Sequence, residues 1–596
     1  MNEKRKGLTL IETVIAIAVM AIVGFAIYRA LLTLLNILNV SEVRVAAANL
    51  ANEQLELIRN MTYDEVGLVG GVPSGFVEPF ETKKKGGYDF NITTIIRSID
   101  DPFDGTIGGA PNDLSPADYK LVEVSLTCTN CPDPQIFRFT GRAAPKNLET
   151  ASTNGALFVQ AIDASGVVIS LATVHITNPT VSPAIDITDT TGVDGYLRII
   201  DVPPAAQSYH VVVSKSGYSG DQTYATSTQN PNPSKIDLTV TSQNVTQSTF
   251  QIDKVSQINF SSVTNICAAI PSVAFSVTGA KLIGTTPDIP KFSQNYTTDA
   301  AGLKTASNLE WDNYTIVGTD ASYDIAGTIP LSPLGLPPNA TQNFKMVAEQ
   351  KNPLSLLITV KDAATQLPLA NTNVTLSAGS FSKAFMTGRG FLSQTDWSGG
   401  SGQMIFSNPS SYADDDGNVD VTSIPGEIDL KQITPGIYAA SGYLTSSIFD
   451  TGSPSNFFDV TSQPQSQPPD TGPDSAKFQI ATATTTSPQT WDFKGPDGTA
   501  ATFYTVGNTN INAVHNGDQY IRYRAYLSTA STTFTPTVSD VAVTFASDCV
   551  PPGQVFFSGL ASNTYDITLT KAGYQTINDV VTVNQPWQEV IYTMGP

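Results

Sequence analysis

The chain opens with MNEKRKGLTLIETVIAIAVMAIVGFAIYRALLTLLNIL, residues 1–38, and the apolar part of this stretch decides how the rest must fold. Between residues 8 and 35 nearly every side chain is apolar, and Glu12 and Arg29 carry the only formal charges. About 20 apolar residues suffice to cross a bilayer, so this run is long enough to span one. A short basic leader precedes it, which predicts that the N-terminal end stays in the cytoplasm. The basic residues of this leader are Lys4, Arg5 and Lys6.

The helix is predicted to continue to about Asn60 as an amphipathic one. Apolar residues recur there at three- and four-residue steps, which is typical of a helix with one buried face. Gln54 is the one polar break in a stripe made of Val40, Val43, Ala47, Leu50 and Leu57. A continuous helix over residues 8–60 would be about 80 Å long. Its first half would lie in lipid, and its second half would pack on a folded head.

Glu12 is the anomaly, because a carboxylate inside an apolar run is costly and usually has a partner. One interpretation is that Glu12 lies near the interface and simply reaches water. The context favours another interpretation. Lys6 and Gly7 followed by Leu-Thr-Leu-Ile-Glu, residues 8–12, resemble the prepilin cleavage and methylation motif of type IV pilins and of type II secretion pseudopilins.

This resemblance implies a processing pathway and an assembly role. A prepilin peptidase would cut after Gly7, and the new N-terminal residue, Leu8, would be N-methylated. Glu12 would pair with the N-terminal amine of a neighbouring pilin subunit in a filament. Most members of the family have Phe where this chain has Leu8. An ordinary secretory signal would instead place a small-residue cleavage site after the apolar region.

Composition bounds the remainder of the chain. A length of 596 residues suggests three to five domains. Only 14% of residues are charged, and 27 Phe and 21 Tyr stand against four Trp. That profile is typical of extracellular β-sandwiches rather than of a cytosolic enzyme. The net charge of −21 would repel nucleic acid and anionic membranes, so no nucleic-acid partner is expected.

Four cysteines are present, in two different contexts. Cys128 and Cys131 form Cys-Thr-Asn-Cys without a second pair or a nearby His, so a zinc site is not expected. A short local disulfide or two free thiols fit better than a redox motif, because a Pro and a predicted strand follow. Cys267 and Cys549 lie in different predicted domains, and the sequence leaves open whether they pair.

Residues 61–148 are predicted to form a small α+β head. Alternating segments at 88–97, 119–127 and 136–142 predict three strands, and a meander of these strands would bury its apolar face against the amphipathic helix. This part resembles the heads of minor pilins and pseudopilins. A loop between the first two strands clusters carboxylates that are weak candidates for a calcium site, while a solvated acidic loop fits better. These carboxylates are Asp100, Asp101 and Asp104, with Asp113 and Asp118 further along the loop.

The remaining residues repeat one pattern of strands at a period near 100 residues, which predicts tandem domains. Each copy resembles the carboxypeptidase regulatory-like, or prealbumin-like, β-sandwich, and the first and third copies end in Lys-x-Gly-Tyr. That resemblance implies spacers or binding units without catalytic residues. The predicted domains are a leader at 1–7, the helix at 8–60, the head at 61–148, sandwiches at 155–250 and 255–349, and a third sandwich split into 353–403 and 549–596.

Residues 404–548 are predicted to be a domain inserted into the third sandwich, since an exposed loop tip tolerates insertion. Its strand pattern looks like a jelly roll of extracellular carbohydrate-binding or discoidin-like modules. The segment 414–420 resembles a calcium loop, but the twelfth position is Pro425 instead of Glu, so a turn fits better. One strand alternates aromatic and basic side chains that could stack on sugar rings or could form a core face and a solvated face. These are Tyr520, Arg522, Tyr523, Arg524 and Tyr526.

Catalysis is not expected, and neither is a cofactor. The histidines are His175, His210 and His515, each in or beside a predicted strand, and no nucleophile elbow, phosphate loop or zinc-protease motif is present. The chain is thus predicted to be multidomain, a long N-terminal helix with a pilin-like head followed by tandem, mainly-β sandwiches.

The expected function is a minor pilin-like subunit of a type IV pilus-type filament that displays sandwich domains for adhesion. The expected partners are the prepilin peptidase, other pilin subunits and a surface glycan or host ligand. The location would be the inner membrane first and the filament or cell surface afterwards. A type II secretion pseudopilin is one alternative, and a membrane-anchored extracellular carbohydrate-binding or glycan-active protein is another.

Overall fold

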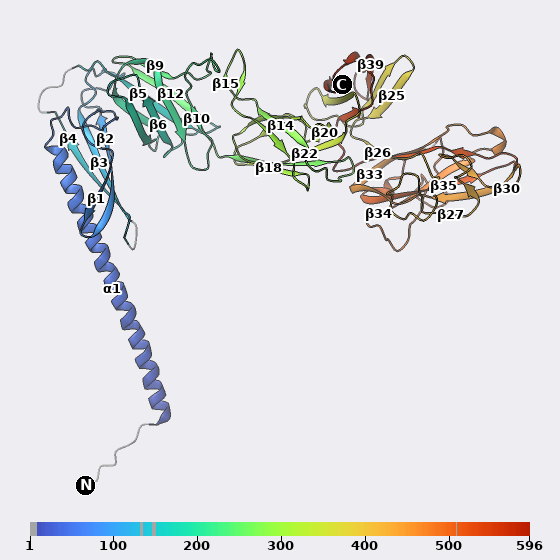
Figure 1. Ribbon diagram of the computed structural model, residues 1–596, viewed down its shortest axis with the longest axis horizontal. Helices are drawn as coiled ribbons and strands as arrows, with labels where there is room; N and C mark the ends of the chain where they lie inside the picture. Colours follow the sequence, from blue (N-terminus) through green and yellow to red (C-terminus); the bar gives the residue numbers. More distant parts are fainter. Residues whose placement is uncertain (1–8, 132–134, 146–150, 508) are drawn as a thin grey trace, which may run out of the picture. The chain divides into compact units, whose positions relative to one another are not determined.

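One long helix precedes a succession of β-sheets in the computed structural model, which describes residues 9–131, 135–145, 151–507 and 509–596 (Figure 1). The chain divides into two compact units. The first contains residues up to 254 together with 282–289, and the second contains 255–281 and 290–596. The predicted fold class, a long N-terminal helix followed by mainly-β domains, is confirmed.

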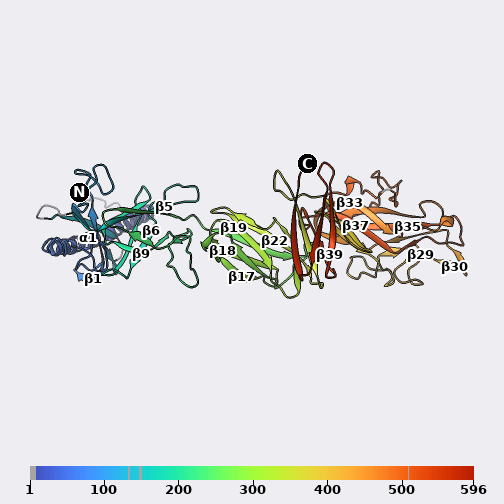
Figure 2. The same ribbon diagram turned by 90° about the horizontal axis from the view of Figure 1, so that it is seen from above.

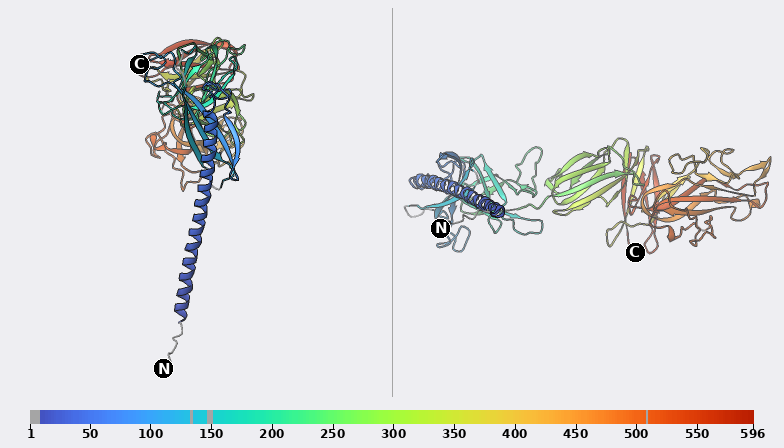
Figure 3. Two further views of the ribbon diagram at one scale, coloured as in Figure 1. Left: turned by 90° about the vertical axis from the view of Figure 1, so that its left-hand side faces the viewer. Right: turned by 90° about the horizontal axis from the view of Figure 1, so that it is seen from below.

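Helix α1 runs without a break over Leu10–Arg59, close to the predicted limits of 8 and 60. Its second half packs on a four-stranded antiparallel sheet in the order β1-β2-β3-β4, as the left view of Figure 3 shows. The strands are β1 Phe80–Lys85, β2 Tyr88–Ile99, β3 Tyr119–Cys128 and β4 Ile136–Ala143. The sheet is the predicted meander with one more strand, and its apolar face covers the helix.

Strand β1 was not predicted, because its sequence, Phe-Glu-Thr-Lys-Lys-Lys, has no apolar alternation. Its position follows from the turn that joins it to β2. Gly86 and Gly87 both adopt positive φ, +60° and +84°, which a two-residue hairpin turn requires. The lysines lie on the sheet edge, where charged side chains oppose pairing with another strand. The signal that could have revealed β1 is therefore the Gly-Gly pair rather than hydrophobicity.

The buried stripe of the helix differs from the predicted one at its C-terminal end. Leu57 is 52% exposed, whereas Ile58 is 2% exposed. The 3.6-residue period places Leu50, Gln54 and Ile58 above one another, so Gln54 continues the buried face instead of breaking it. The buried residues are Val43, Ala46, Ala47, Leu50, Ala51, Gln54, Leu55 and Ile58.

The first sandwich packs two sheets together, and Figure 2 labels β5, β6 and β9 among its strands. Its core includes the fully buried Tyr209 and Phe250. One sheet has the order β12-β5-β8, in which β12 runs parallel to β5. The other has the order β10-β9-β6-β7, with β11 also paired to β9. The strands are β5 Gly155–Ile162, β6 Thr173–Asn178, β7 Ile185–Thr190, β8 Tyr196–Val202, β9 Ala205–Ser214, β10 Asp221–Gln222, β11 Leu238–Val240 and β12 Val245–Gln251.

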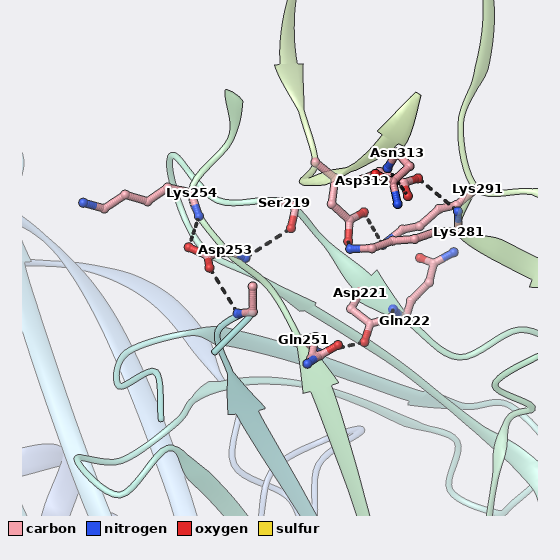
Figure 4. Close-up of polar contacts among 12 residues, drawn as sticks. Ser219, Asp221, Gln222, Gln251, Asp253, Lys254, Lys281, Lys291, Asp312 and Asn313 are labelled. Atoms are coloured by element: carbon pink, nitrogen blue, oxygen red, sulfur yellow. Dashed lines mark hydrogen bonds and ion pairs between the residues drawn. The ribbon is translucent and has the colours of Figure 1, made fainter. Parts of the chain in front are cut away.

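Polar contacts close the end of this sandwich (Figure 4). The backbone amide of Asp253 donates to Ser219 Oγ at 3.2 Å, and Asp253 Oδ1 accepts from the amide of Lys254 at 2.7 Å. The amide of Gln251 donates to Asp221 Oδ2 at 2.9 Å. These bonds satisfy backbone groups just where the last strand ends.

The second sandwich has two four-stranded sheets, β18-β13-β22-β20 and β17-β14-β19-β21, around a core rich in Phe and Tyr. Asp312 caps the loop beside it by accepting from the amides of Lys281 and Asn313 (Figure 4). The strands are β13 Ser256–Val263, β14 Ala274–Gly279, β17 Ser293–Thr297, β18 Leu303–Leu309, β19 Asp312–Gly318, β20 Tyr323–Ile329, β21 Leu334–Leu336 and β22 Thr341–Gln350. A small pair, β15 Leu282–Gly284 with β16 Ile289–Pro290, interrupts this order.

The third sandwich is assembled from two distant parts of the chain. Strand β23 pairs with β38 on one side and, in parallel, with β41 on the other. The second sheet has the order β25-β24-β39-β40. The strands are β23 Ser355–Asp362, β24 Asn373–Ala378, β25 Phe381–Met386, β38 Gln554–Phe557, β39 Asn563–Thr570, β40 Ile577–Val583 and β41 Trp587–Met594. The strands on either side of the predicted insert therefore do pair.

The insert begins earlier than predicted, and the boundary at residue 404 is wrong. Strand β26 pairs with β37 of the insert, with Gly390 opposite Phe545. The chain leaves the third sandwich at a tight turn, where Gly388 has a φ of +73°. The large sheet runs β26-β37-β33-β35-β32-β27, with β34 also on β35. Its strands are β26 Gly390–Gln394, β27 Asp414–Asp415, β32 Ser441–Thr445, β33 Phe449–Gln463, β34 Ala476–Ala483, β35 Asp518–Ser528 and β37 Asp540–Ala546.

Smaller elements complete the insert. A three-stranded sheet, β28-β29-β36, and a pair, β30-β31, flank the large sheet, and Trp397 lies fully buried in the shared core. These strands are β28 Val419–Asp420, β29 Ile428–Leu430, β30 Gln432–Thr434, β31 Ile437–Tyr438 and β36 Thr537–Val538. Two short 3-10 helices, Pro469–Thr471 and Ala513–His515, lie between strands. The domain boundaries apart from that at 404 stay predictions.

Each of the three sandwiches contains one buried tyrosine in the same structural role. The hydroxyls of Tyr209, Tyr314 and Tyr565 donate to the carbonyl oxygens of Pro203, Glu310 and Ala561, four to six residues upstream. Such a tyrosine ties a loop to the strand that follows it. The shared device supports the prediction that the three sandwiches are copies of one domain type.

Candidate functional site

The first half of helix α1 exposes its apolar side chains, and this surface is the candidate functional site. Every residue from Leu10 to Leu38 is exposed, with Leu10 at 85% and Met20 at 78%. The most apolar 18-residue segment of the helix has a mean hydropathy of 2.6, and none of it is buried in the structure. By length and composition this is the one helix among the described residues that could cross a membrane. An apolar surface of this size needs lipid or other helices to cover it.

Glu12 lies in the first turn and forms a capping box with Thr9. Glu12 Oε2 accepts from the backbone amide of Thr9 at 3.0 Å and from Thr9 Oγ1 at 2.8 Å. The amide of Glu12 donates back to Thr9 Oγ1 at 3.4 Å. This satisfies two of the amides that a helix N-terminus leaves unpaired. This capping box was not predicted, although Thr-x-x-Glu before an apolar run is its ordinary sequence signature.

The capping box leaves part of the Glu12 carboxylate available. Both bonds from Thr9 end on Oε2, and no described residue donates to Oε1. Glu12 is exposed, so a cation from another chain can reach Oε1 while Thr9 holds the side chain. Gly7 and Leu8, the predicted processing residues, lie outside the described residues. The arrangement therefore presents a positioned anion at the start of an apolar helix.

The carboxylates that come together in the head loop are only partly those predicted. Asp104, Asp113 and Asp118 have carboxylate oxygens within 4.8 Å of one another. Asp100 instead accepts from the amide of Ile107 at 2.9 Å, and Asp101 is exposed. Desolvation, reinforced by the neighbouring carboxylates, raises the pKa of both Asp100 and Asp118. Hydrogen bonds to loop amides account for much of this cluster, as in an ordered acidic turn.

The cysteines form two disulfides in the structure. Cys128 and Cys131 are joined at the end of β3, so the first of the two predicted alternatives applies. A cavity of about 170 Å³ lies beside Cys131, where Val40 and Val43 of the helix approach Phe137. Cys267 and Cys549 are also joined, and this bond closes a loop over a sequence separation of 282. The sequence left this second pairing open.

The alternating side chains of β35 point to two faces of the sheet. One face is the core that the core-and-surface interpretation requires, but the other is not fully solvated. Tyr523 is 2% exposed in the core, where its hydroxyl accepts from Trp397 Nε1 at 2.9 Å. Arg522 and Arg524 lie on the opposite face, and Arg522 is only 5% exposed. The second face is therefore not simply solvated.

The other residues singled out by sequence have structural partners. Asp420 holds the turn that follows it by accepting from the amides of Thr422 and Ser423, and hydrogen bonds to these two residues lower its pKa to about 2 against the opposing effect of burial. The segment 414–420 itself contains β27, β28 and the residues that join them. His175 contacts Asp186 at 2.7 Å, and His210 contacts Asp237 at 3.0 Å. His515 is 2% exposed, and its Nδ1 lies 3.1 Å from Thr482 Oγ1.

Comparison with known proteins finds both sequence and structural similarities. No curated protein matches the chain. The TIE protein of Bacillus anthracis is 12% identical over 53% of this chain and 69% of that chain, with a TM-score of 0.15. The shaft pilin SpaA of Lactobacillus rhamnosus GG is 11% identical over 33% and 98%, with a TM-score of 0.14. The minor pilin of Streptococcus agalactiae is 10% identical over 33% and 96%, with a TM-score of 0.17.

At such identities and TM-scores, these structures carry no argument about what the chain binds or assembles with. The N-terminal segment is different, because residues 3–28 match the prokaryotic N-terminal methylation motif. This match covers the predicted cleavage site, Glu12 and most of the exposed apolar run. The N-terminal methylation motif predicted from the sequence is thereby confirmed.

Proposed function

We propose that this chain is a minor pilin-like subunit of a type IV pilus-type filament, which displays its β-sandwich domains outside the cell for adhesion. One observation carries the proposal. The methylation motif opens a single helix whose first half is exposed and apolar while its second half is buried in a folded head. The helix can thus exchange lipid for the helices of other subunits without unfolding the head.

The geometry suggests the order of events. The unassembled subunit would lie in the inner membrane, with the helix as its anchor and the β-domains outside. The prepilin peptidase would cut after Gly7 and leave Leu8 as the N-terminal residue. Extraction into a filament would bury the apolar helix among other helices, and the carboxylate of Glu12 would meet a neighbour's amine. The large β portion suits a filament tip or surface better than a repeated shaft.

A pair of substitutions separates the two roles of Glu12. Glu12→Gln keeps a side chain that can complete the capping box but removes the charge. Thr9→Val removes the cap but keeps the charge. Under the proposal, Glu12→Gln abolishes incorporation into sheared filaments and Thr9→Val reduces it only slightly. The opposite order would show that Glu12 acts as a cap alone.

Mass spectrometry of the N-terminus checks the processing step. In cells with prepilin peptidase, the mature chain should begin at N-methylated Leu8, and without the peptidase it should retain residues 1–7. A mature N-terminus elsewhere would overturn the proposal. Loss of protein secretion with intact pili after deletion would favour a type II secretion pseudopilin instead.

A further inference from the structure

The outer face of the large sheet in the insert gathers basic and aromatic side chains, and we call it the arginine face. Strands β34, β35, β32 and β27 are hydrogen-bonded neighbours there, and Figure 1 labels β34, β35 and β27 in the insert. The segment between β34 and β35 folds back onto this face and supplies three aromatic rings. The arginine face comprises Tyr443, Lys477, Trp491, Phe493, Phe503, Arg522, Arg524 and Tyr526.

Arg524 is held between two rings. Its guanidinium carbon lies 4.2 Å from the centre of the Phe493 ring and 4.8 Å from that of the Tyr443 ring. Its Nε donates to Thr445 Oγ1 at 3.0 Å, which fixes the rotation of the group. Stacking holds a guanidinium plane while leaving its edge free to donate. No described residue accepts from the two terminal nitrogens of Arg524, so a preoriented fork of donors remains.

Arg522 is a buried cation without a carboxylate partner. It is 5% exposed, its Nε donates to the carbonyl of Ser446 at 3.0 Å, and the Trp491 ring covers it at 5.4 Å. Throughout the described ranges, no carboxylate oxygen lies within 4.0 Å of Arg522 or Arg524. A buried charge is normally paired, and an unpaired one costs several kcal/mol. The cost is consistent with a site that an external anion completes.

The lack of carboxylate partners for Arg522 and Arg524 is unusual for a chain with this charge balance. Acidic residues outnumber basic ones by 53 to 32, so carboxylates are plentiful. Other arginines use them, as Arg97 does with Asp189 at 2.6 Å and Arg389 with Asp459 at 2.7 Å. Burial lowers the pKa of Arg522, and the charge of Asp414, which is exposed and lies beyond ion-pair distance, offsets only part of this effect. Two neighbouring arginines left unpaired in so acidic a protein point to a ligand that brings its own negative charge.

We propose that the arginine face binds an acidic polysaccharide, a sugar chain that carries carboxylate or sulfate groups. Arg524 is partly exposed, so its terminal nitrogens can engage an acidic group of such a chain, while the buried Arg522 adds a second positive charge two residues, about 7 Å, along the same strand. The partly exposed rings of Tyr443 and Tyr526 offer surfaces for the apolar faces of the sugar rings.

A nucleic acid fits this face less well. Binding to nucleic acid relies largely on Lys and Arg contacts to phosphates, and this face supplies three cations in a chain of net charge −21. The inference deepens the proposed adhesive function by naming a ligand class. It rests on that function only for the exposure of the insert outside the cell.

Binding measurements on the purified full-length protein in detergent micelles test the inference. The probes are polygalacturonate for carboxylates, heparin for sulfates, neutral dextran and a single-stranded oligonucleotide. We expect salt-sensitive binding to one or both acidic polysaccharides and none to dextran. Arg524→Gln should weaken it about tenfold or more, since it removes charge-assisted hydrogen bonds. The affinity of Arg524→Lys should lie between those of the unaltered protein and Arg524→Gln, because Lys keeps the charge but not the planar fork of donors.

The matched control is Arg198→Gln, an exposed arginine of the first sandwich that pairs with Asp194, and it should bind as the unaltered protein does. Phe493→Leu is a second variant that loosens the stack without changing charge, and it should weaken binding while the melting temperature shows the insert still folded. The inference is overturned if neither acidic polysaccharide binds, if Arg524→Gln binds unchanged, or if the oligonucleotide binds as tightly. These outcomes do not depend on filament assembly, so they stand apart from the Glu12 test.

Discussion

Gln54 of helix α1 accepts a hydrogen bond from Lys83 of strand β1, with 2.9 Å between Oε1 and Nζ. Gln54 is 5% exposed, and Lys83 also pairs with Glu81 at 2.8 Å. The bond ties the edge strand of the head to the buried face of the helix. It explains how a polar residue can occupy a position in the apolar stripe without leaving a buried group unsatisfied.

Replacing Gln54 should therefore loosen the contact between β1 and the helix. Gln54→Ala is expected to lower the local free energy of unfolding by about 1–3 kcal/mol, since it removes a buried hydrogen bond and leaves a gap. Hydrogen exchange of residues 80–85 measures this directly. Asn52→Ala on the exposed side of the same helix is the control and should leave exchange unchanged. Equal effects of the two substitutions would contradict the role assigned to Gln54.

The neighbouring pair Leu57 and Ile58 tests the face on which the helix packs. Ile58→Ala should destabilise the head by about 2–4 kcal/mol, because it removes a side chain that is 2% exposed. Leu57→Ala should change stability by about 0.5 kcal/mol or less, because Leu57 is 52% exposed. Denaturant unfolding followed by hydrogen exchange in the head distinguishes them. A larger loss of stability in Leu57→Ala than in Ile58→Ala would instead support the buried face predicted from sequence, which contained Leu57.

The insert contains two groups whose pH effects oppose each other. Burial lowers the pKa of His515 to about 4, below its ordinary value of 6.5, so its contribution to stability is lost as pH falls from about 6.5 to 4. Burial, reinforced by Glu427, raises the pKa of Asp429 to about 6, so its contribution is lost as pH rises from about 4 to 6. The two should partly cancel between pH 4 and 6.

Single substitutions should reveal each slope. In His515→Gln, stability of the insert should fall as pH rises from 4 to 6, because the Asp429 effect remains alone. In Asp429→Asn, stability should rise with pH over the same interval. The melting temperature of the insert as a function of pH measures both, with His175→Gln as a control at an exposed histidine. Parallel curves for the two variants would contradict the assignment.

The disulfide between Cys267 and Cys549 should contribute more stability than the local one. Closing a long loop restricts the unfolded chain, and the chain-entropy relation gives about 5–6 kcal/mol for a separation of 282 residues. Replacing both cysteines by Ser should lower the melting temperature of the second unit by several degrees. The comparison is the double substitution Cys128→Ser and Cys131→Ser, which removes a disulfide that spans a separation of only 3 residues. A larger loss from the short loop would argue against this ranking.

Much of the fold was predictable, because its elements carry local signals. The helix was predicted within two residues at its start and one at its end, since apolar periodicity and charge define it. Strand β1 was missed because an edge strand rich in Lys has no buried face to mark it. Strand β26 was assigned to the third sandwich because no local feature shows which of two sheets a short strand will join.

The candidate sites also differ in whether a local sequence signal marks them. The methylation motif and Glu12 could be found from sequence, because processing acts on a short linear segment. The contacts of Arg524 with Tyr443 and Phe493 could not, because the three residues are far apart in the chain. Pairing of β32 with β35 brings Tyr443 close, and the folding back of the segment between β34 and β35 brings Phe493. The pairing of Cys267 with Cys549 also depends on tertiary structure alone.

The long disulfide loop also has a mechanical consequence. A ligand held by the insert would pull on residues between Cys267 and Cys549, which are attached to the rest of the chain through both cysteines. Tension would then divide between two covalent strands instead of running along one. The bond also withholds roughly 1,000 Å of extensible backbone, given a separation of 282 residues and about 3.5 Å for each. While the bond holds, a pull on the insert would therefore not extend the backbone between Cys267 and Cys549.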